Sequence, residues 1–216
     1  MQFIDLKTQQ KRIRQDIEKR ILNVLDHGRY IMGPEIKELE KQLADYVGVT
    51  HCITCSSGTD ALLMPLMAWN IGPGDAVFVP TFTFIATAEM VQLLGATPVF
   101  VDIDKDTFNM DPVKLEEKIL EVIANDVLKP KAVIPVDLFG LPASYPEIQN
   151  IADSHDILVL EDGAQGFGGK IGDQKVCSFG DAATTSFFPA KPLGGYGDGG
   201  AVFTNNDELA EKLESI

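Results

Sequence analysis

The chain has 216 residues, and 45% of them are hydrophobic, which is enough to bury the core of one large or two small domains. Its 18 Lys and Arg residues against 32 Asp and Glu residues give a formal charge of −14 at pH 7, which disfavours nucleic acid as the main partner. No run of 18 apolar residues occurs and no basic segment precedes an apolar one at the start, so we expect no membrane partner and a cytoplasmic location.

The first 48 residues predict two helices. Apolar side chains recur at helical spacing over residues 6–25, and Gly28 ends this stretch. Pro34 opens a second amphipathic helix, which closes at Gly48. We therefore expect residues 1–48 to form an N-terminal helical segment.

Residues 49–216 predict an α/β domain in which short β-branched strands alternate with helices. Alternation of this kind favours βαβ units and a mainly parallel central sheet with helices on both faces. A hairpin is expected over residues 170–175, and a last helix after residues 205–208 stops with the sequence, which is typical of a part of a longer protein. The expected strands lie at 53–54, 76–79, 98–101, 132–135 and 157–160, and the expected helices near 59–69, 84–94, 112–121 and 145–154.

Ligands of such sheets bind at the carboxyl ends of the strands, where three segments carry suitable residues. Small residues after the first strand, Gly58 and Thr59 among them, open a helix whose free amides could hold a phosphate, although small residues also cap helices without any ligand. Phe84 follows the second strand and could stack on a planar ring, whereas burial in the core is the default for a phenylalanine.

Glu161 and Asp162 end an apolar strand. Paired acids could bind a metal or act as acid and base. Because neighbouring residues of a strand face opposite ways, we expect one carboxylate, that of Asp162, to point into the site and the other to point away.

Lys191 stands between the aromatic pair Phe187 and Phe188 and a glycine-rich run. A lone lysine in a loop is usually solvated, but these flanks predict a buried backbone, where desolvation lowers the pKa of the amine and favours a Schiff base. A carboxylate elsewhere in the site would keep the pyridine nitrogen of pyridoxal phosphate protonated, and Asp162 fits that role.

The three cysteines, Cys52, Cys55 and Cys177, form no pattern of zinc ligands, and the three histidines are scattered. Reduced cysteines in or near the core are the favoured interpretation. We predict no metal site.

Four motifs in order resemble the pyridoxal-phosphate-dependent sugar aminotransferases of the DegT/DnrJ/EryC1/StrS family. The resemblance runs from Phe3 to the last residue. It implies the large domain of an aspartate-aminotransferase-like, fold type I enzyme, with residues 49–216 as the cofactor-binding domain, a missing C-terminal small domain, and a homodimer with shared active sites. The motifs are residues 58–62 (GTDAL), 80–84 (PTFTF), 161–165 (EDGAQ) and 186–191 (SFFPAK).

The resemblance also implies a role for each site residue. Lys191 would bond the cofactor and serve as general base, Asp162 would hold its pyridine nitrogen, and Gln165 its phenolic oxygen. Phe84 would stack on the ring. The phosphate would be held by Gly58, Thr59 and Ser186.

Within the family, residues 3–10 and 191–200 look most like enzymes that aminate the 3-keto group of UDP-2-acetamido-3-keto-glucuronic acid for surface polysaccharide synthesis, with L-glutamate as amino donor. Two alternatives remain. The chain could be a truncated, non-catalytic fragment that keeps the fold and binds cofactor or another chain. It could also catalyse another fold type I reaction such as desulfuration, although none of the three cysteines shows a sign of the mobile, reactive thiol this needs.

Overall fold

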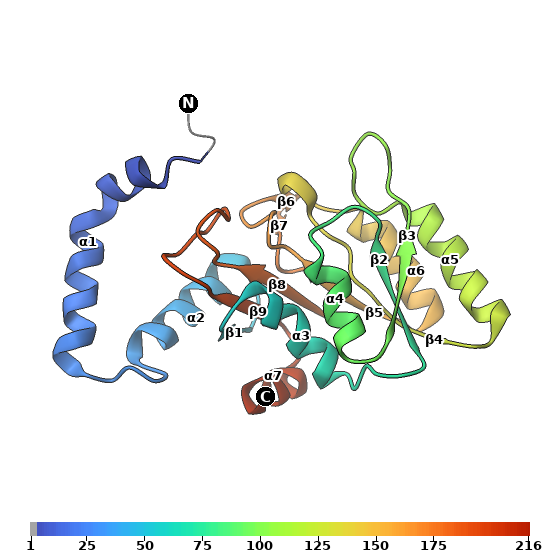
Figure 1. Ribbon diagram of the computed structural model, residues 1–216, viewed down its shortest axis with the longest axis horizontal. Coiled ribbons are helices and arrows are strands. Elements are labelled where there is room, and N and C mark those ends of the chain that lie inside the picture. Colours follow the sequence, from blue (N-terminus) through green and yellow to red (C-terminus); the bar gives the residue numbers. More distant parts are fainter. Residues whose placement is uncertain (1–3) are drawn as a thin grey trace.

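A seven-stranded sheet forms the centre of the computed structural model, which describes residues 4–216 (Figure 1). The strand order is β1-β9-β8-β5-β4-β2-β3, and β9 runs in the direction opposite to that of the other six strands. The predicted mainly parallel α/β sheet is thereby confirmed. The strands are β1 (His51–Cys55), β2 (Asp75–Pro80), β3 (Thr97–Val101), β4 (Lys129–Val133), β5 (Leu158–Asp162), β8 (Ala182–Ser186) and β9 (Gly200–Thr204), beside the separate hairpin of β6 (Lys170–Ile171) and β7 (Gln174–Lys175).

Helices cover both faces of the sheet. Helices α3, α4 and α7 pack on one face, and α2, α5 and α6 pack on the other. Alternate residues of β2 serve the two cores, with Val77 and Val79 on the first face and Ala76 and Phe78 on the second. The helices are α1 (Leu6–His27), α2 (Pro34–Val47), α3 (Gly58–Ala68), α4 (Ala86–Leu93), α5 (Pro112–Asn125), α6 (Tyr145–His155) and α7 (Asp207–Ser215), with a 3-10 turn η1 at Leu138–Gly140.

Strands β8 and β9 are absent from the sequence-based expectation. Strand β8 has the sequence AATTS, without the large β-branched residues that mark the other strands, yet all five of its residues are buried. Small side chains suit this position because α3 packs closely over it. The helix expected near residues 84–94 also begins later, at Ala86, which leaves Phe84 in the loop after β2.

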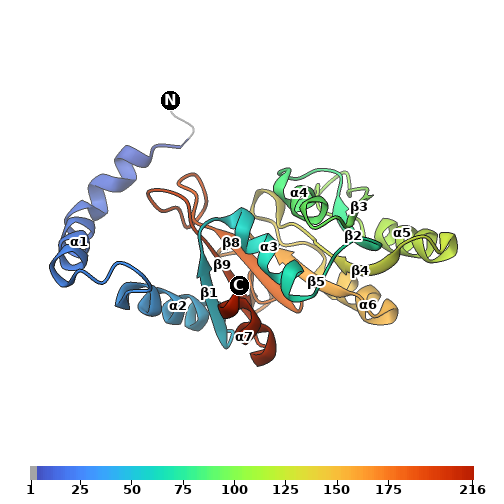
Figure 2. The ribbon, with the colours of Figure 1, turned by 60° about the horizontal axis from the view of Figure 1, so that its bottom comes forward.

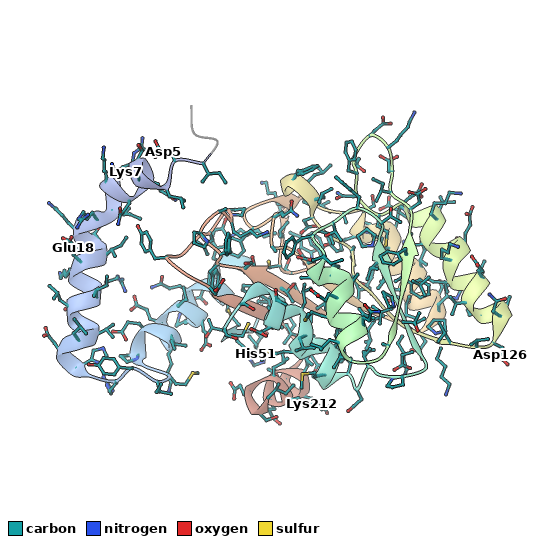
Figure 3. All side chains as sticks on the ribbon, in the orientation of Figure 1. Asp5, Lys7, Glu18, His51, Asp126 and Lys212 are labelled. Carbon is teal, nitrogen blue, oxygen red and sulfur yellow. The ribbon has the colours of Figure 1, made fainter. Side chains whose placement is uncertain are left out.

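Helix α1 stands apart from the sheet on the side of β1 (Figure 2). Asp5 caps its first turn by accepting a hydrogen bond of 3.0 Å from the Thr8 amide, and Figure 3 shows Lys7 near this start and Glu18 farther along the helix. None of its residues is buried, and its exposed apolar side chains include those of Ile13, Ile21, Leu22 and Leu25. The start of the 3–10 motif, Phe3, lies outside the described residues.

Over residues 4–216, no helix combines the length and the apolar character needed to cross a membrane.

Candidate active site

One cavity at the carboxyl edge of the sheet, of about 460 Å³, brings together all seven residues predicted for the site. A larger hollow of about 530 Å³ lies between α1 and α2, but it is lined by polar and charged side chains and contains none of them. The seven residues come from four segments of the chain, and they are Gly58, Thr59, Phe84, Asp162, Gln165, Ser186 and Lys191.

The start of α3 forms one part of the cavity. Ser57 caps the helix, because its Oγ accepts a hydrogen bond of 3.0 Å from the Asp60 amide. The Asp60 carboxylate takes the hydroxyls of Ser56 and Ser57, at 2.5 and 2.7 Å, and these hydrogen bonds lower its pKa. The amides of Gly58 and Thr59 make no hydrogen bond within the described chain, so they remain available for an anion.

Gly58 lets α3 begin directly against β8. A Cβ atom at this position would lie 2.4 Å from Cβ and 2.8 Å from Oγ of Ser186, so any side chain here would force the two elements apart. Ser186 is buried, and its Oγ accepts a hydrogen bond of 3.2 Å from the Phe188 amide. Its hydroxyl hydrogen is therefore free to point toward an anion beside the helix start.

Asp162, the last residue of β5, lines the cavity from a buried position. Its Oδ2 accepts a hydrogen bond of 2.9 Å from Thr87 Oγ1, and its Oδ1 accepts one of 3.2 Å from the Ala164 amide. Burial raises the pKa of this carboxyl, while the two hydrogen bonds and the charge of Lys191 oppose the rise.

Glu161 faces the opposite way, as the alternation of the strand predicts. It is fully buried, and its carboxylate accepts hydrogen bonds from the amides of Cys177 at 2.5 Å and Phe179 at 2.8 Å. Of the two adjacent acids, only Asp162 lines the cavity.

Gln165, which is half-buried, and Phe84, which is exposed, line the same cavity. The Oε1 atom of Gln165 accepts a hydrogen bond of 3.1 Å from the Phe139 amide, which orients the side chain. Phe84 is 65% exposed, so burial in the core is excluded as the reason for this phenylalanine.

Lys191 lines the cavity and is half-buried. The expectation of a buried segment around it is wrong for most of the glycine-rich run, since the residues from Pro192 to Gly194 and from Tyr196 to Asp198 are exposed. The physical reason is the topology: this loop connects the antiparallel strands β8 and β9 and extends beyond the sheet (Figure 1).

Sequence reasoning missed Thr87 and Asp198. Thr87 is buried in the first turn of α4 and holds the Asp162 carboxylate, and Asp198 lines the cavity from the loop after Lys191. Neither residue has a local signal in the sequence, because Thr87 lies within α4 and the polar residues Thr81 and Thr83 stand nearer to the end of β2.

The site suits a planar molecule that carries a phosphate. Free helix amides and a hydroxyl fit an anion, an exposed aromatic ring fits a flat ring system, and a buried carboxylate fits a protonated ring nitrogen. Lys191 adds an amine. Within residues 4–216 no three His, Cys, Asp or Glu side chains gather in a way that would hold a metal ion.

Comparison with known proteins agrees with this geometry. The chain is 52% identical over its full length to the UDP-2-acetamido-2-deoxy-3-oxo-D-glucuronate aminotransferase of Pseudomonas aeruginosa, of which it covers 58%. All of it superposes on 58% of a DegT DnrJ EryC1 StrS aminotransferase from Brucella abortus, with 56% identity and a TM-score of 0.99. It also matches Bacillus subtilis NtdA with bound cofactor PMP, at 34% identity and a TM-score of 0.88 over 99% of this chain and 47% of that one.

The chain thus spans between 47% and 58% of the length of these relatives. The family model matches residues 11–216, nearly the whole chain. The chain belongs to the DegT/DnrJ/EryC1/StrS aminotransferase family.

Proposed function

We propose that this protein uses pyridoxal phosphate to transfer an amino group from L-glutamate to a keto sugar nucleotide, with UDP-2-acetamido-2-deoxy-3-oxo-glucuronate as the acceptor. The observation that carries the proposal is the single cavity shared by the start of α3, the Asp162 carboxylate and the Lys191 amine. The similarity to the Pseudomonas aeruginosa enzyme supports the choice of sugar.

The residues of the cavity fit the cofactor at both of its ends. The amides of Gly58 and Thr59 and the hydroxyl of Ser186 would bind the phosphate. Asp162, ionised, would keep a proton on the ring nitrogen, and Thr87 stabilises that ionised form by donating to Oδ2. Phe84 would cover one face of the ring, and Gln165 would bind its phenolic oxygen.

When bound, pyridoxal phosphate supplies an aldehyde that bonds amines and a ring that accepts the electrons of a broken C–H bond. Lys191 Nζ would bond this aldehyde before the amino donor arrives. Once displaced by the donor, the same nitrogen is a base beside the site and would move a proton from the α-carbon of glutamate.

Several further proposals follow from the resemblance. The product would serve surface polysaccharide synthesis in the cytoplasm, and residues 49–216 would be the cofactor-binding large domain beside an N-terminal helical segment of residues 1–48. We also propose a homodimer. The exposed apolar side chains of α1, which no part of the described chain buries, support a protein partner for this helix.

Absorbance spectroscopy tests the cofactor site, and a separate assay tests turnover. Purified protein is titrated with pyridoxal phosphate beside Lys191→Ala and the control Lys170→Ala, which removes an exposed lysine of the β6–β7 hairpin. In the parent and in the control we expect a new absorbance band at a longer wavelength than the band of free cofactor. We expect no such band in Lys191→Ala. The same spectrum in all three proteins would contradict the role of Lys191.

Addition of L-glutamate should shift that band, and amination of the 3-keto and 4-keto sugar nucleotides is then followed by mass spectrometry. We expect product from the 3-keto substrate. A band without any amination would support the alternative of a chain that binds cofactor without turnover.

A further inference from the structure

A second acidic residue, Asp137, lies behind the cavity and contacts Glu161. Val136 pairs with Asp162 in parallel, which places the neighbouring Asp137 and Glu161 on the same face of the sheet, and both residues are fully buried. Within residues 4–216, neither carboxyl group lies within 4 Å of a Lys, Arg or His nitrogen. Two ionised carboxylates in this position would repel each other without any compensating cation.

The hydrogen bonds show where a proton fits. Both oxygens of Glu161 accept backbone hydrogen bonds, from Cys177 and Phe179. Oδ1 of Asp137 accepts two, from the Ala143 amide and from the Tyr145 hydroxyl, each at 2.9 Å. Oδ2 of Asp137 is buried and accepts no hydrogen bond from any donor among the described residues. It is therefore the oxygen left to carry a proton and donate it to Glu161.

The backbone around Asp137 connects this pair to the active site. Its amide donates to the Asp162 carbonyl at 3.1 Å, and its Cβ lies against the Cα of Gly166, where an added Cβ would come within 2.5 Å. Asp137 also fixes the loop of residues 138–143, whose Phe139 amide orients Gln165. The Glu161 carboxylate fixes the segment of residues 177–179 by accepting hydrogen bonds from the amides of Cys177 and Phe179.

We propose that Asp137 and Glu161 share one proton, carried on Asp137 Oδ2, and that this buried pair is a positioning device for Asp162 and Gln165. The positioning role rests on the proposed function, whereas the shared proton does not. With one proton the pair carries one negative charge instead of two, so Asp162 can ionise in the same buried region.

Burial raises the pKa of both carboxyls of the pair. The other titratable groups that face them are Tyr145 from α6, Cys177 after β7 and Asp162 on β5, and none of these is a cation. Since the folded protein then holds a proton that the unfolded chain releases above about pH 4, its stability should fall as the pH rises from there through the native titration of the pair.

Two isosteric variants distinguish the donor from the acceptor. In Asp137→Asn the amide group can replace the O–H donor while its oxygen still accepts from Ala143 and Tyr145. In Glu161→Gln the amide nitrogen must face a backbone N–H, of Cys177 or of Phe179, so one hydrogen bond is lost. The proposal therefore predicts a tolerated change at Asp137 and a damaging one at Glu161.

Infrared spectroscopy of the protein without cofactor provides the direct readout. We expect the C=O stretch of a protonated carboxyl group at pH 7 in the parent and its loss in Asp137→Asn, whose thermal stability should also vary less between pH 5 and pH 8. Pyridoxal phosphate affinity should stay within about twofold in Asp137→Asn and fall about tenfold in Glu161→Gln.

Absence of the carboxyl band in the parent, equal effects of the two variants, or greater damage from Asp137→Asn would each overturn the proposal. Because the band and the unfolding curves need no cofactor, they test the shared proton even if the proposed enzymatic function fails. Failure of the parent itself to bind pyridoxal phosphate would instead count against the proposed function.

Discussion

Thr87 Oγ1 donates a hydrogen bond of 2.9 Å to Asp162 Oδ2 across 75 residues of sequence, and both residues are buried. The bond joins the first turn of α4 to the end of β5 and stabilises the ionised carboxylate against the effect of burial. An ionised Asp162 is what a protonated ring nitrogen needs as its partner.

Replacing Thr87 with valine should weaken pyridoxal phosphate binding about tenfold. The loss corresponds to about 1.5 kcal/mol, the lower end for a hydrogen bond to a charged group, and it also raises the pKa of Asp162. Equilibrium titration followed by absorbance measures the dissociation constant. Thr87→Ser, which keeps the hydroxyl, should restore most of the affinity; equal weakening by serine and valine would show that the methyl group rather than the hydrogen bond matters.

Gly58→Ala should damage both the fold and the cofactor site. Its new Cβ would lie 2.4 Å from Ser186 Cβ, so α3 and β8 must separate, at a cost of about 1–3 kcal/mol of unfolding free energy. Relative to the parent, we expect the affinity of the variant for pyridoxal phosphate to fall more than its affinity for pyridoxal. The reason is that the helix amides move away from the phosphate. Urea denaturation and titration with the two ligands measure these effects.

The matched control for that variant is Gly72→Ala, in the turn before β2. The nearest atom to its added Cβ, the carbonyl oxygen of Leu94, lies at 3.9 Å, an ordinary contact distance. This variant should keep the parental stability and affinity within error. If it were as damaging as Gly58→Ala, close packing against Ser186 could not be the cause.

The position of Gly58 could be predicted from the sequence because a strand, a small-residue turn and a helix start follow one another locally. Lys191 and Asp162 were found by similar local signals. The partners of Asp162 were not, because Thr87 reaches it only after α4 packs on the sheet. Asp137 was missed for the same reason: its contacts to Ala143, Tyr145 and Glu161 depend on how the loops at the edge of the sheet fold together.

The interior strand β8 could not be predicted from its sequence because AATTS has neither alternation nor large apolar residues. Its place between β5 and β9 is set by close packing with α3 and by pairing with both neighbours. The reversed direction of β9 likewise depends on the length and path of the loop that carries Lys191. Residue patterns predict the layers of this fold, but not the order and direction of every strand.

Asp111→Ala should destabilise the protein by about 1 kcal/mol through the loss of a helix cap. Asp111 Oδ1 accepts hydrogen bonds from the amides of Val113 at 2.8 Å and Lys114 at 3.3 Å at the start of α5. Urea denaturation measures the change. Glu116→Ala, an exposed position on the same helix, is the control and should have little effect. If Glu116→Ala lowered the free energy of unfolding as much as Asp111→Ala does, the capping explanation would be contradicted.

The three cysteines should react slowly with iodoacetamide in the folded protein. Burial raises the pKa of Cys52 and Cys177, and raises that of Cys55 to about 11. At pH 8 only about one Cys55 thiol in a thousand would then be the reactive thiolate, against about one in four for a free cysteine. Mass spectrometry of samples labelled with and without urea measures the difference.

Slow labelling of all three cysteines in the native protein and fast labelling in urea would agree with buried thiols. It would also argue against desulfuration, the alternative fold type I reaction, because that chemistry requires a reactive thiolate that can reach the substrate. Fast modification of Cys55, the only one of the three cysteines in a half-buried position, would reopen that alternative, because its Sγ lies 3.3 Å from the carbonyl oxygen of Ser57, a residue that lines the cavity. The labelling pattern therefore bears on the reaction as well as on the fold.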